Sequence, residues 1–227
     1  MDIPASLPPS TLRDRLLDLE AVYRRADADV EAFAAASGIA CVAGCGACCR
    51  GFVPDVLPVE ASYMAALIVA GRPEAAHAMA SGTLAPLSWP DGSTGCPLYD
   101  DDNPLHCTVY QARPLVCRMF GFSGLVDRLG RLSYSLCRVM AAPARPSTVS
   151  NPASPRSARE PDLEAIFGAL PPVMSGPGAE LVGLDPAASG RRRPLTVALP
   201  EALSAVLFLA GLHSDCQAEP SSVSSMP

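Results

Sequence analysis

The sequence predicts a mainly α-helical protein with a small β-hairpin, built around an irregular, loop-rich domain that binds a metal through cysteines. Three observations support this fold class. Apolar residues recur at helical spacing over residues 11–37, and residues 125–137 have the pattern of a β-hairpin with Gly130 at its turn. Eight of the nine cysteines lie between Cys41 and Cys137. A chain of 227 residues is long enough for one good core and a second small module.

The N-terminal segment, residues 1–37, is expected to form a long helix that packs on the rest of the domain. After a loose leader, the apolar positions step alternately by four and three residues. This stripe comprises Leu12, Leu16, Leu19, Tyr23, Ala26, Val30 and Phe33. Thr11 and Asp14 form a plausible capping pair, and Gly38 is a suitable stop. A coiled-coil seam would show the same spacing, but the repeat is short, so packing within the domain is the better interpretation.

The cysteine-cluster metal-binding domain is expected over residues 38–140. Pro58 opens one helix in this region and Pro73 opens a shorter one, because proline suits the first helical turn. Residues 81–95 are expected to be a loop. The hairpin at 125–137 then delivers Cys137 at the end of a strand.

Three segments follow this domain. Residues 141–161 form a linker rich in proline and serine, with few side chains to bury. A C-terminal helical segment, 162–212, is expected to contain one helix near 162–170 and an apolar one near 200–212. Residues 213–227 are expected to be a disordered tail.

Charge and hydropathy exclude two classes of partner. The net charge is −6, and the basic residues are all arginine, so a general nucleic-acid binder is not expected. The only basic run, at 190–194, is typical of a solvated turn. The N-terminus has neither a basic nor an apolar targeting region, and the longest apolar run, 205–212, is too short for a membrane span. We therefore expect a cytoplasmic protein with no membrane and no nucleic-acid partner.

The clustered cysteines give the strongest indication of function. Cytoplasmic thiols stay reduced, so a cysteine cluster favours a metal or a catalytic thiol over a disulfide framework. Thiolates select zinc, Cu(I) or iron–sulfur centres, and C-x3-C-x2-C spacing at Cys41, Cys45 and Cys48 suits a loop wrapped around a metal. Buried free cysteines also fill cores, but four cysteines in nine residues of a glycine- and alanine-rich loop would pack poorly.

The cysteines and their neighbours form a longer pattern. Cys41-x3-Cys45-x2-Cys48-Cys49-Arg50 is followed by Cys96-Pro97-Leu98, Cys107-Thr108-Val109-Tyr110, Arg113-Pro114-Leu115-Val116-Cys117-Arg118-Met119-Phe120 and Cys137. In this pattern the chain resembles the YkgJ-type proteins, a family of zinc- or iron-chelating domains. The resemblance covers about residues 38–140. It implies a metal site holding an iron–sulfur cluster, of the 4Fe-4S type, or zinc, without a defined reaction.

The resemblance also implies the ligand set. The metal ligands would be Cys41, Cys45, Cys48, Cys49, Cys96, Cys107, Cys117 and Cys137. His106 is not part of the pattern, and Cys216 stands apart in the tail, so neither is expected to bind the metal.

Two arginines next to cysteines are candidate cofactor-binding residues. Arg50 and Arg118 would donate hydrogen bonds to thiolates or to cluster sulfides, which lowers the cost of gathering negative charge. The alternative is that they are ordinary surface arginines that pair with the acidic run 100–102.

Several function classes remain open. The leading one is a metal-binding protein in electron transfer, or a metal-dependent accessory protein, acting with an unidentified protein partner. A zinc-stabilised interaction module comes second, and an iron-dependent enzyme or enzyme subunit third, so enzyme status is undecided. A radical-SAM enzyme shares the C-x3-C-x2-C spacing but normally has alternating strands and helices. A cysteine nucleophile would need a nearby histidine that the chain does not supply convincingly.

The number of metal centres also remains open. Neighbouring side chains diverge, so Cys48 and Cys49 are awkward partners on one ion. Eight thiols exceed the four that one zinc or one common iron–sulfur cluster takes. Either two four-cysteine centres separate Cys48 from Cys49, or one centre leaves spare thiols. The short helical frame favours one centre, completed by the segment 96–137.

Overall fold

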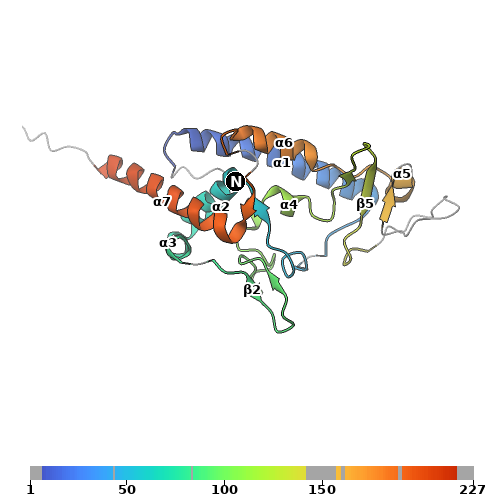
Figure 1. Ribbon diagram of the computed structural model, residues 1–227, viewed down its shortest axis with the longest axis horizontal. Coiled ribbons are helices and arrows are strands. Elements are labelled where there is room, and N and C mark those ends of the chain that lie inside the picture. The colour runs from blue at the N-terminus through green and yellow to red at the C-terminus, as the bar shows by residue number, and fades with distance from the viewer. Residues whose placement is uncertain are drawn as a thin grey trace, which may run out of the picture.

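The computed structural model describes residues 7–42, 44–82, 84–141, 157–159, 162–188 and 191–218. The part described is mainly helical, with small antiparallel sheets, which confirms the predicted fold class (Figure 1). Its helices are α1 (Thr11–Ser37), α2 (Pro58–Gly71), α3 (Pro73–Ser81), α4 (Leu115–Arg118), α5 (Asp162–Phe167), α6 (Ser175–Leu184) and α7 (Leu195–Ala218), with a 3-10 turn at Tyr110–Ala112. The paired strands are β1 (Asp55–Val56) with β7 (Arg193–Pro194), β2 (Leu87–Ser88) with β3 (Thr94–Gly95), and β4 (Leu125–Val126) with β5 (Leu132–Ser135) and β6 (Ser157–Arg159).

Helix α1 has the predicted bounds and buried stripe. Most of the predicted apolar positions are buried, and Leu12 and Val30 pack partly buried against the core. Gly38 ends the helix in the left-handed conformation at φ 72°. The N-cap is Ser10 and not the predicted Thr11. The Ser10 side chain accepts a hydrogen bond from the backbone N–H of Arg13 at 3.3 Å. Helix α6 lies alongside α1 (Figure 1).

The main hydrophobic core lies between α1, α2, α3 and α7. Helix α7 contributes a continuous buried face through Leu195, Leu199, Leu203 and Val206. It therefore begins earlier than predicted and runs through Pro200, because burial of this face outweighs the backbone hydrogen bond that proline removes.

Helix α7 also ends later than predicted. Its backbone is helical to Ala218, so residues 213–218 of the expected disordered tail are helical. An established helix extends at low cost, because each added residue gains one backbone hydrogen bond. Residues 219–227 lie outside the described residues.

A second hydrophobic core lies beside the β4–β5–β6 sheet and α5. Its centre is a cluster of aromatic rings, with Phe33 and Tyr134 at 5.4 Å and Tyr134 and Phe167 at 4.9 Å between centroids. The predicted hairpin is present, with Gly130 at φ 78° in its turn. Residues 157–159 of the expected linker form β6 and pair with β5, while the linker positions 142–156 and 160–161 lie outside the described residues.

Two elements differ from the sequence-based expectation. The loop expected at 81–95 contains the β2–β3 hairpin, closed by a hydrogen bond from the Trp89 N–H to the Ser93 carbonyl at 2.9 Å. Helix α6 forms in a stretch rich in glycine and proline, where burial of Leu181 against α1 outweighs poor helix propensity. No helix among the described residues is both long enough and apolar enough to cross a bilayer.

Candidate metal centre

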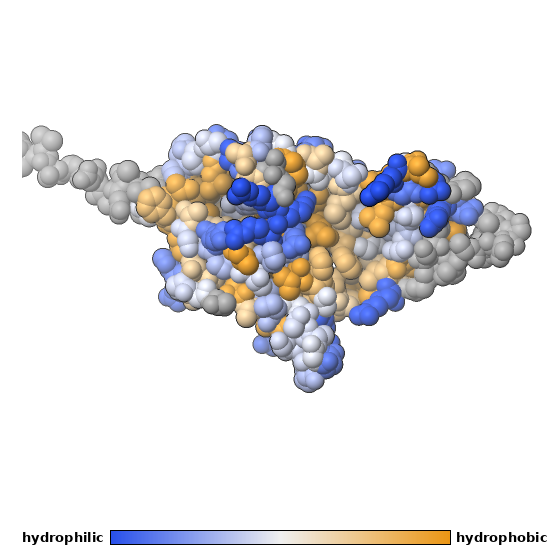
Figure 2. Space-filling model, in the orientation of Figure 1, coloured by the Kyte–Doolittle hydropathy of each residue, from blue (hydrophilic) through white to orange (hydrophobic). Residues whose placement is uncertain are grey.

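All eight clustered cysteines line one cavity of about 600 Å³. The cavity lies between the loop 41–50, the segment that carries Cys96 and Cys107, helix α4 and the end of the β4–β5 hairpin. Apolar colour extends over the centre of the face shown in Figure 2, above the projecting β2–β3 hairpin. The fold thus brings together thiols that are up to almost a hundred residues apart in the sequence.

Cys49 and Cys96 are joined through their backbones. The N–H of Cys96 donates a 2.9 Å hydrogen bond to the carbonyl oxygen of Cys49. Gly95 permits this approach, because a Cβ at that position would collide with the same carbonyl and with the ring of Trp89. Cys96 is buried in the main core, and Cys49 packs against it.

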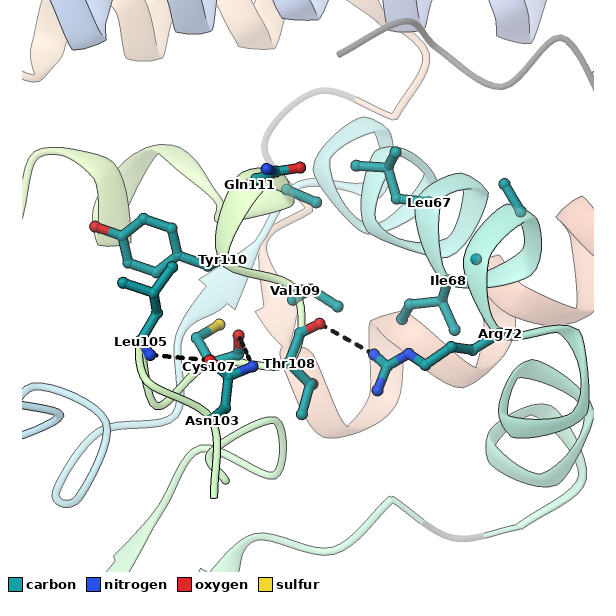
Figure 3. Close-up of a pocket in the computed structure, with 13 residues that line it drawn as sticks. Leu67, Ile68, Arg72, Asn103, Leu105, Cys107, Thr108, Val109, Tyr110 and Gln111 are labelled. Carbon is teal, nitrogen blue, oxygen red and sulfur yellow. Dashed lines mark hydrogen bonds between the residues drawn. The ribbon is translucent and has the colours of Figure 1, made fainter. Parts of the chain in front are cut away.

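Cys107 is held by contacts on both sides. The Thr108 N–H donates to the Leu98 carbonyl at 3.0 Å, which ties this segment to the one that carries Cys96. On the other side, Arg72 donates to the Thr108 carbonyl at 3.1 Å and the Asn103 side chain donates to the Cys107 carbonyl at 3.2 Å (Figure 3). These contacts border a second, more open cavity of about 530 Å³ that Cys107 shares with the first.

Cys117 lies on the single turn of α4, which Glu60 anchors. The Glu60 side chain is fully buried and accepts a 2.8 Å hydrogen bond from the N–H of Leu115, the first residue of α4. The same carboxylate accepts from the Leu57 N–H at 2.9 Å and the Tyr23 hydroxyl at 3.1 Å, and Arg192 lies 3.4 Å away. Glu60 therefore fixes the start of α4 relative to α1 and α2.

The loop 41–50 depends on glycine. Gly44 and Gly46 have φ values of 64° and 54°, in the left-handed region. A Cβ at Gly46 would also lie 2.7 Å from the ring of Tyr99. Within this loop Cys41 and Cys48 are exposed and Cys45 is half-buried.

Cys137 reaches the cavity from the second core. It follows β5 and packs against that core, and its carbonyl accepts from the Met140 N–H at 3.0 Å. A Cβ at Gly121 would lie 3.2 Å from the Cys137 Cβ, so the loop after α4 passes close to this cysteine.

The clustered thiols have different pKa values because their surroundings differ. Burial raises the pKa of Cys96 to about 11 and also raises the pKa values of Cys107 and Cys117. The Cys48 and Cys49 sulfur atoms lie 3.9 Å apart. A hydrogen bond from the Cys49 thiol lowers the pKa of Cys48 to about 6, and the same interaction raises the pKa of Cys49. In the metal-free protein, Cys48 therefore ionises at lower pH than Cys49, because their pKa values are shifted in opposite directions.

Comparison with protein families covers this whole cluster. Residues 40–151 match the family model CxxCxxCC, described as a "putative zinc- or iron-chelating domain". This segment, slightly less than half of the chain, is similar to that family. Comparison with curated proteins and with solved structures gives no match. The family description supports a metal-binding role for the eight cysteines that the matched segment contains.

The zinc- or iron-chelating domain is not a separate folding unit in this chain. Helices α1 and α7 lie outside the matched residues, yet both supply buried residues to the main core that carries Cys49, Cys96 and Cys107. The metal-chelating segment is therefore built into a larger helical body.

The donor set of the chelating domain fits a thiophilic metal. The cavity lining contains eight thiols and no histidine, a set that suits zinc, Cu(I) or an iron–sulfur cluster. Among the described residues, no three histidine, cysteine, aspartate or glutamate side chains converge closely enough to hold one ion. The thiols thus surround the cavity instead of meeting at one point.

The predicted cofactor-binding arginines have other contacts. Arg118 bonds to Asp27 at 2.5 Å and to the Arg113 carbonyl at 2.8 Å, and its guanidinium covers the Tyr23 ring at 4.1 Å. Arg118 borders the cavity, whereas Arg50 is not in its lining and covers the Trp89 ring at 5.4 Å. Their roles toward a cofactor stay predictions.

Arg113 is the arginine in the cavity lining with an unsatisfied buried donor. Its Nε is buried and has no hydrogen-bond partner among the described residues. Its guanidinium lies 3.7 Å from the centroid of the Tyr110 ring. Arg113 lies four residues before Cys117 in the sequence, but the sequence-based prediction chose Arg50 and Arg118 as the cofactor-binding residues.

Proposed function

We propose that this protein holds an iron–sulfur cluster in the cysteine-lined cavity and acts in the cytoplasm as an electron-transfer or metal-dependent accessory protein. The single observation that carries this proposal is that eight thiols line one cavity. A thiol set spread around a cavity suits a polynuclear cluster, whose cysteines bind at separate iron atoms. Such a cluster supplies one-electron redox chemistry when it is bound.

The chain's own residues would hold the cluster and restrict its access to water. Cys96 is buried and Cys117 is half-buried, each on a backbone fixed by hydrogen bonds, so they supply ligands on the inner wall. Phe52 and Phe120 lie near each other at the cavity edge, with 6.4 Å between ring centroids, and both are partly exposed. An exposed apolar edge beside a redox centre favours a protein partner that docks there.

Zinc is the second candidate, and the family description favours it as much as iron. In that case the thiolates would hold zinc in closed four-coordinate sites, and the metal would stabilise the fold of an interaction module. The site supports no particular reaction, so no enzymatic activity is proposed.

Anaerobic purification of the full chain, followed by metal and acid-labile sulfide analysis, tests this function. We expect iron and sulfide in equal amounts and a brown protein with visible absorption. A colourless protein that contains zinc and no sulfide would contradict the iron–sulfur cluster and support the zinc-stabilised module. A protein that retains no metal under these conditions would refute both. The matched control is Cys216→Ser, which removes the cysteine outside the cluster and should leave the metal content unchanged.

A further inference from the structure

We propose that the eight cysteines form two neighbouring four-thiol sites that share this cavity. The inner group is Cys49, Cys96, Cys107 and Cys117, and the outer group is Cys41, Cys45, Cys48 and Cys137. This inference rests on the proposed metal-binding function and adds which thiols act together. It also replaces the expectation of a single centre, which relied on the limited frame visible in the sequence.

The inner group is built on the main hydrophobic core. Cys96 belongs to that core, and Cys49 and Cys107 pack against it. Cys117 lies between Leu115 and Met119, two fully buried residues of the same core. The Cys96 N–H bonds directly to the Cys49 carbonyl, and the bond from the Thr108 N–H to the Leu98 carbonyl joins the segments that carry Cys107 and Cys96.

The outer group depends on the second core and on the exposed loop. Cys137 packs against the second core, and Cys41 follows Ile39, which is buried in it. Cys45 and Cys48 lie on the glycine-containing loop that continues from Cys41. Cys41 and Cys48 are exposed, whereas no inner thiol is. The two groups thus have different supports and different access to solvent.

The adjacent pair marks that boundary. The Cys48 and Cys49 sulfur atoms lie 3.9 Å apart, so the two sites would adjoin at this pair. Cys49 packs against the main core and its carbonyl bonds to Cys96, which assigns it to the inner group. Cys48 is exposed like Cys41, and both line the cavity, which assigns Cys48 to the outer group.

The test compares Cys96→Ser and Cys137→Ser in the full chain, purified anaerobically, with metal per chain as the readout and Cys216→Ser as the control. Cys96→Ser and Cys137→Ser should each lose half of the wild-type metal, and the variant with both substitutions should lose all of it. If either single variant loses all the metal, one centre is present. If Cys137→Ser keeps all its metal, the outer group is not a metal site.

A second variant guards against loss of folding. Cys96 is buried, so Cys49→Ser, at a half-buried position of the same group, provides an independent measurement. It should also lose half of the metal, and full retention or complete loss would overturn the division. A wild-type protein with no metal would refute the proposed function itself, whereas wild-type metal that disappears completely in every single variant refutes only the two sites.

Discussion

The backbone N–H of Cys96 bonds to the carbonyl oxygen of Cys49 at 2.9 Å, so two cysteines far apart in sequence are joined without any metal. Gly95 makes this approach possible, and the main core holds both cysteines in place. One wall of the cavity is therefore formed by ordinary packing and hydrogen bonding. The exposed part of the loop 41–50 has fewer such supports, so metal binding should order it most.

Glu60→Ala should destabilise the protein by about 3 kcal/mol. The change leaves the Leu115 and Leu57 N–H groups and the Tyr23 hydroxyl without their buried acceptor. Urea unfolding of the variant and the wild type measures this difference. Glu74→Ala, at an exposed position on α3, is the matched control and should change stability far less. Equal effects of the two substitutions would show that Glu60 does not anchor α4.

Cys48 should be the first thiol alkylated in the metal-free protein at pH 7. Its pKa is about 6 because the Cys49 thiol donates a hydrogen bond to it, so Cys48 is largely thiolate at that pH. Brief treatment with iodoacetamide followed by peptide mass spectrometry identifies the modified residue. Cys49→Ala removes the donor and should slow the labelling of Cys48. Unchanged labelling in that variant would contradict the proposed cause.

The metal-free protein should lose stability as the pH rises from about 9 to about 11. The folded state keeps Cys96 protonated, with its pKa raised by burial from 9.0 to about 11, while the unfolded chain ionises near 9.0. The stability that protonated Cys96 contributes is fully present below the pKa of the unfolded chain, 9.0. It is lost as the pH rises through the pKa of the folded state, about 11. Urea unfolding at several pH values measures this loss. The free energy of unfolding should fall less steeply with pH in Cys96→Ser than in the wild type. Equal slopes would exclude Cys96 as a source of the decline.

Arg113→Gln should lower the reduction potential of an iron–sulfur centre in this cavity. Removing a positive charge beside a negatively charged centre disfavours adding an electron. Protein-film voltammetry measures the shift, and Arg113→Lys, which keeps the charge, should restore most of it. Arg50→Gln is the control, because Arg50 is not in the cavity lining. A shift with Arg50→Gln and none with Arg113→Gln would reverse these assignments.

Periodicity and terminal residues predicted the helices that have strong local signals. The alternating stripe and Gly38 placed both ends of α1, and Pro58 and Pro73 placed the starts of α2 and α3. Helix α7 was predicted to begin too late because a local pattern does not show that Leu195 and Leu199, which precede Pro200, are buried in the main core.

The cysteine pattern predicted which residues line the cavity but not how they are held. Glu60 bonds to Leu115 across more than fifty residues, and nothing near either residue in the sequence indicates this pairing. The role of Gly95 depends on contact with Cys49, which only the folded chain brings about. Division of the thiols between two cores is likewise a tertiary property, since both cores combine distant segments.

X-ray absorption spectroscopy at the metal edge of the anaerobically purified protein tests most directly whether the cysteines of this cavity hold the metal. If they do, sulfur alone should surround the metal, at about 2.3 Å for zinc and similar distances for iron. The spectrum should lose this sulfur shell in a variant with all eight clustered cysteines replaced by serine and keep it in Cys216→Ser. A ligand shell dominated by nitrogen or oxygen in the wild type would contradict a cysteine-held centre.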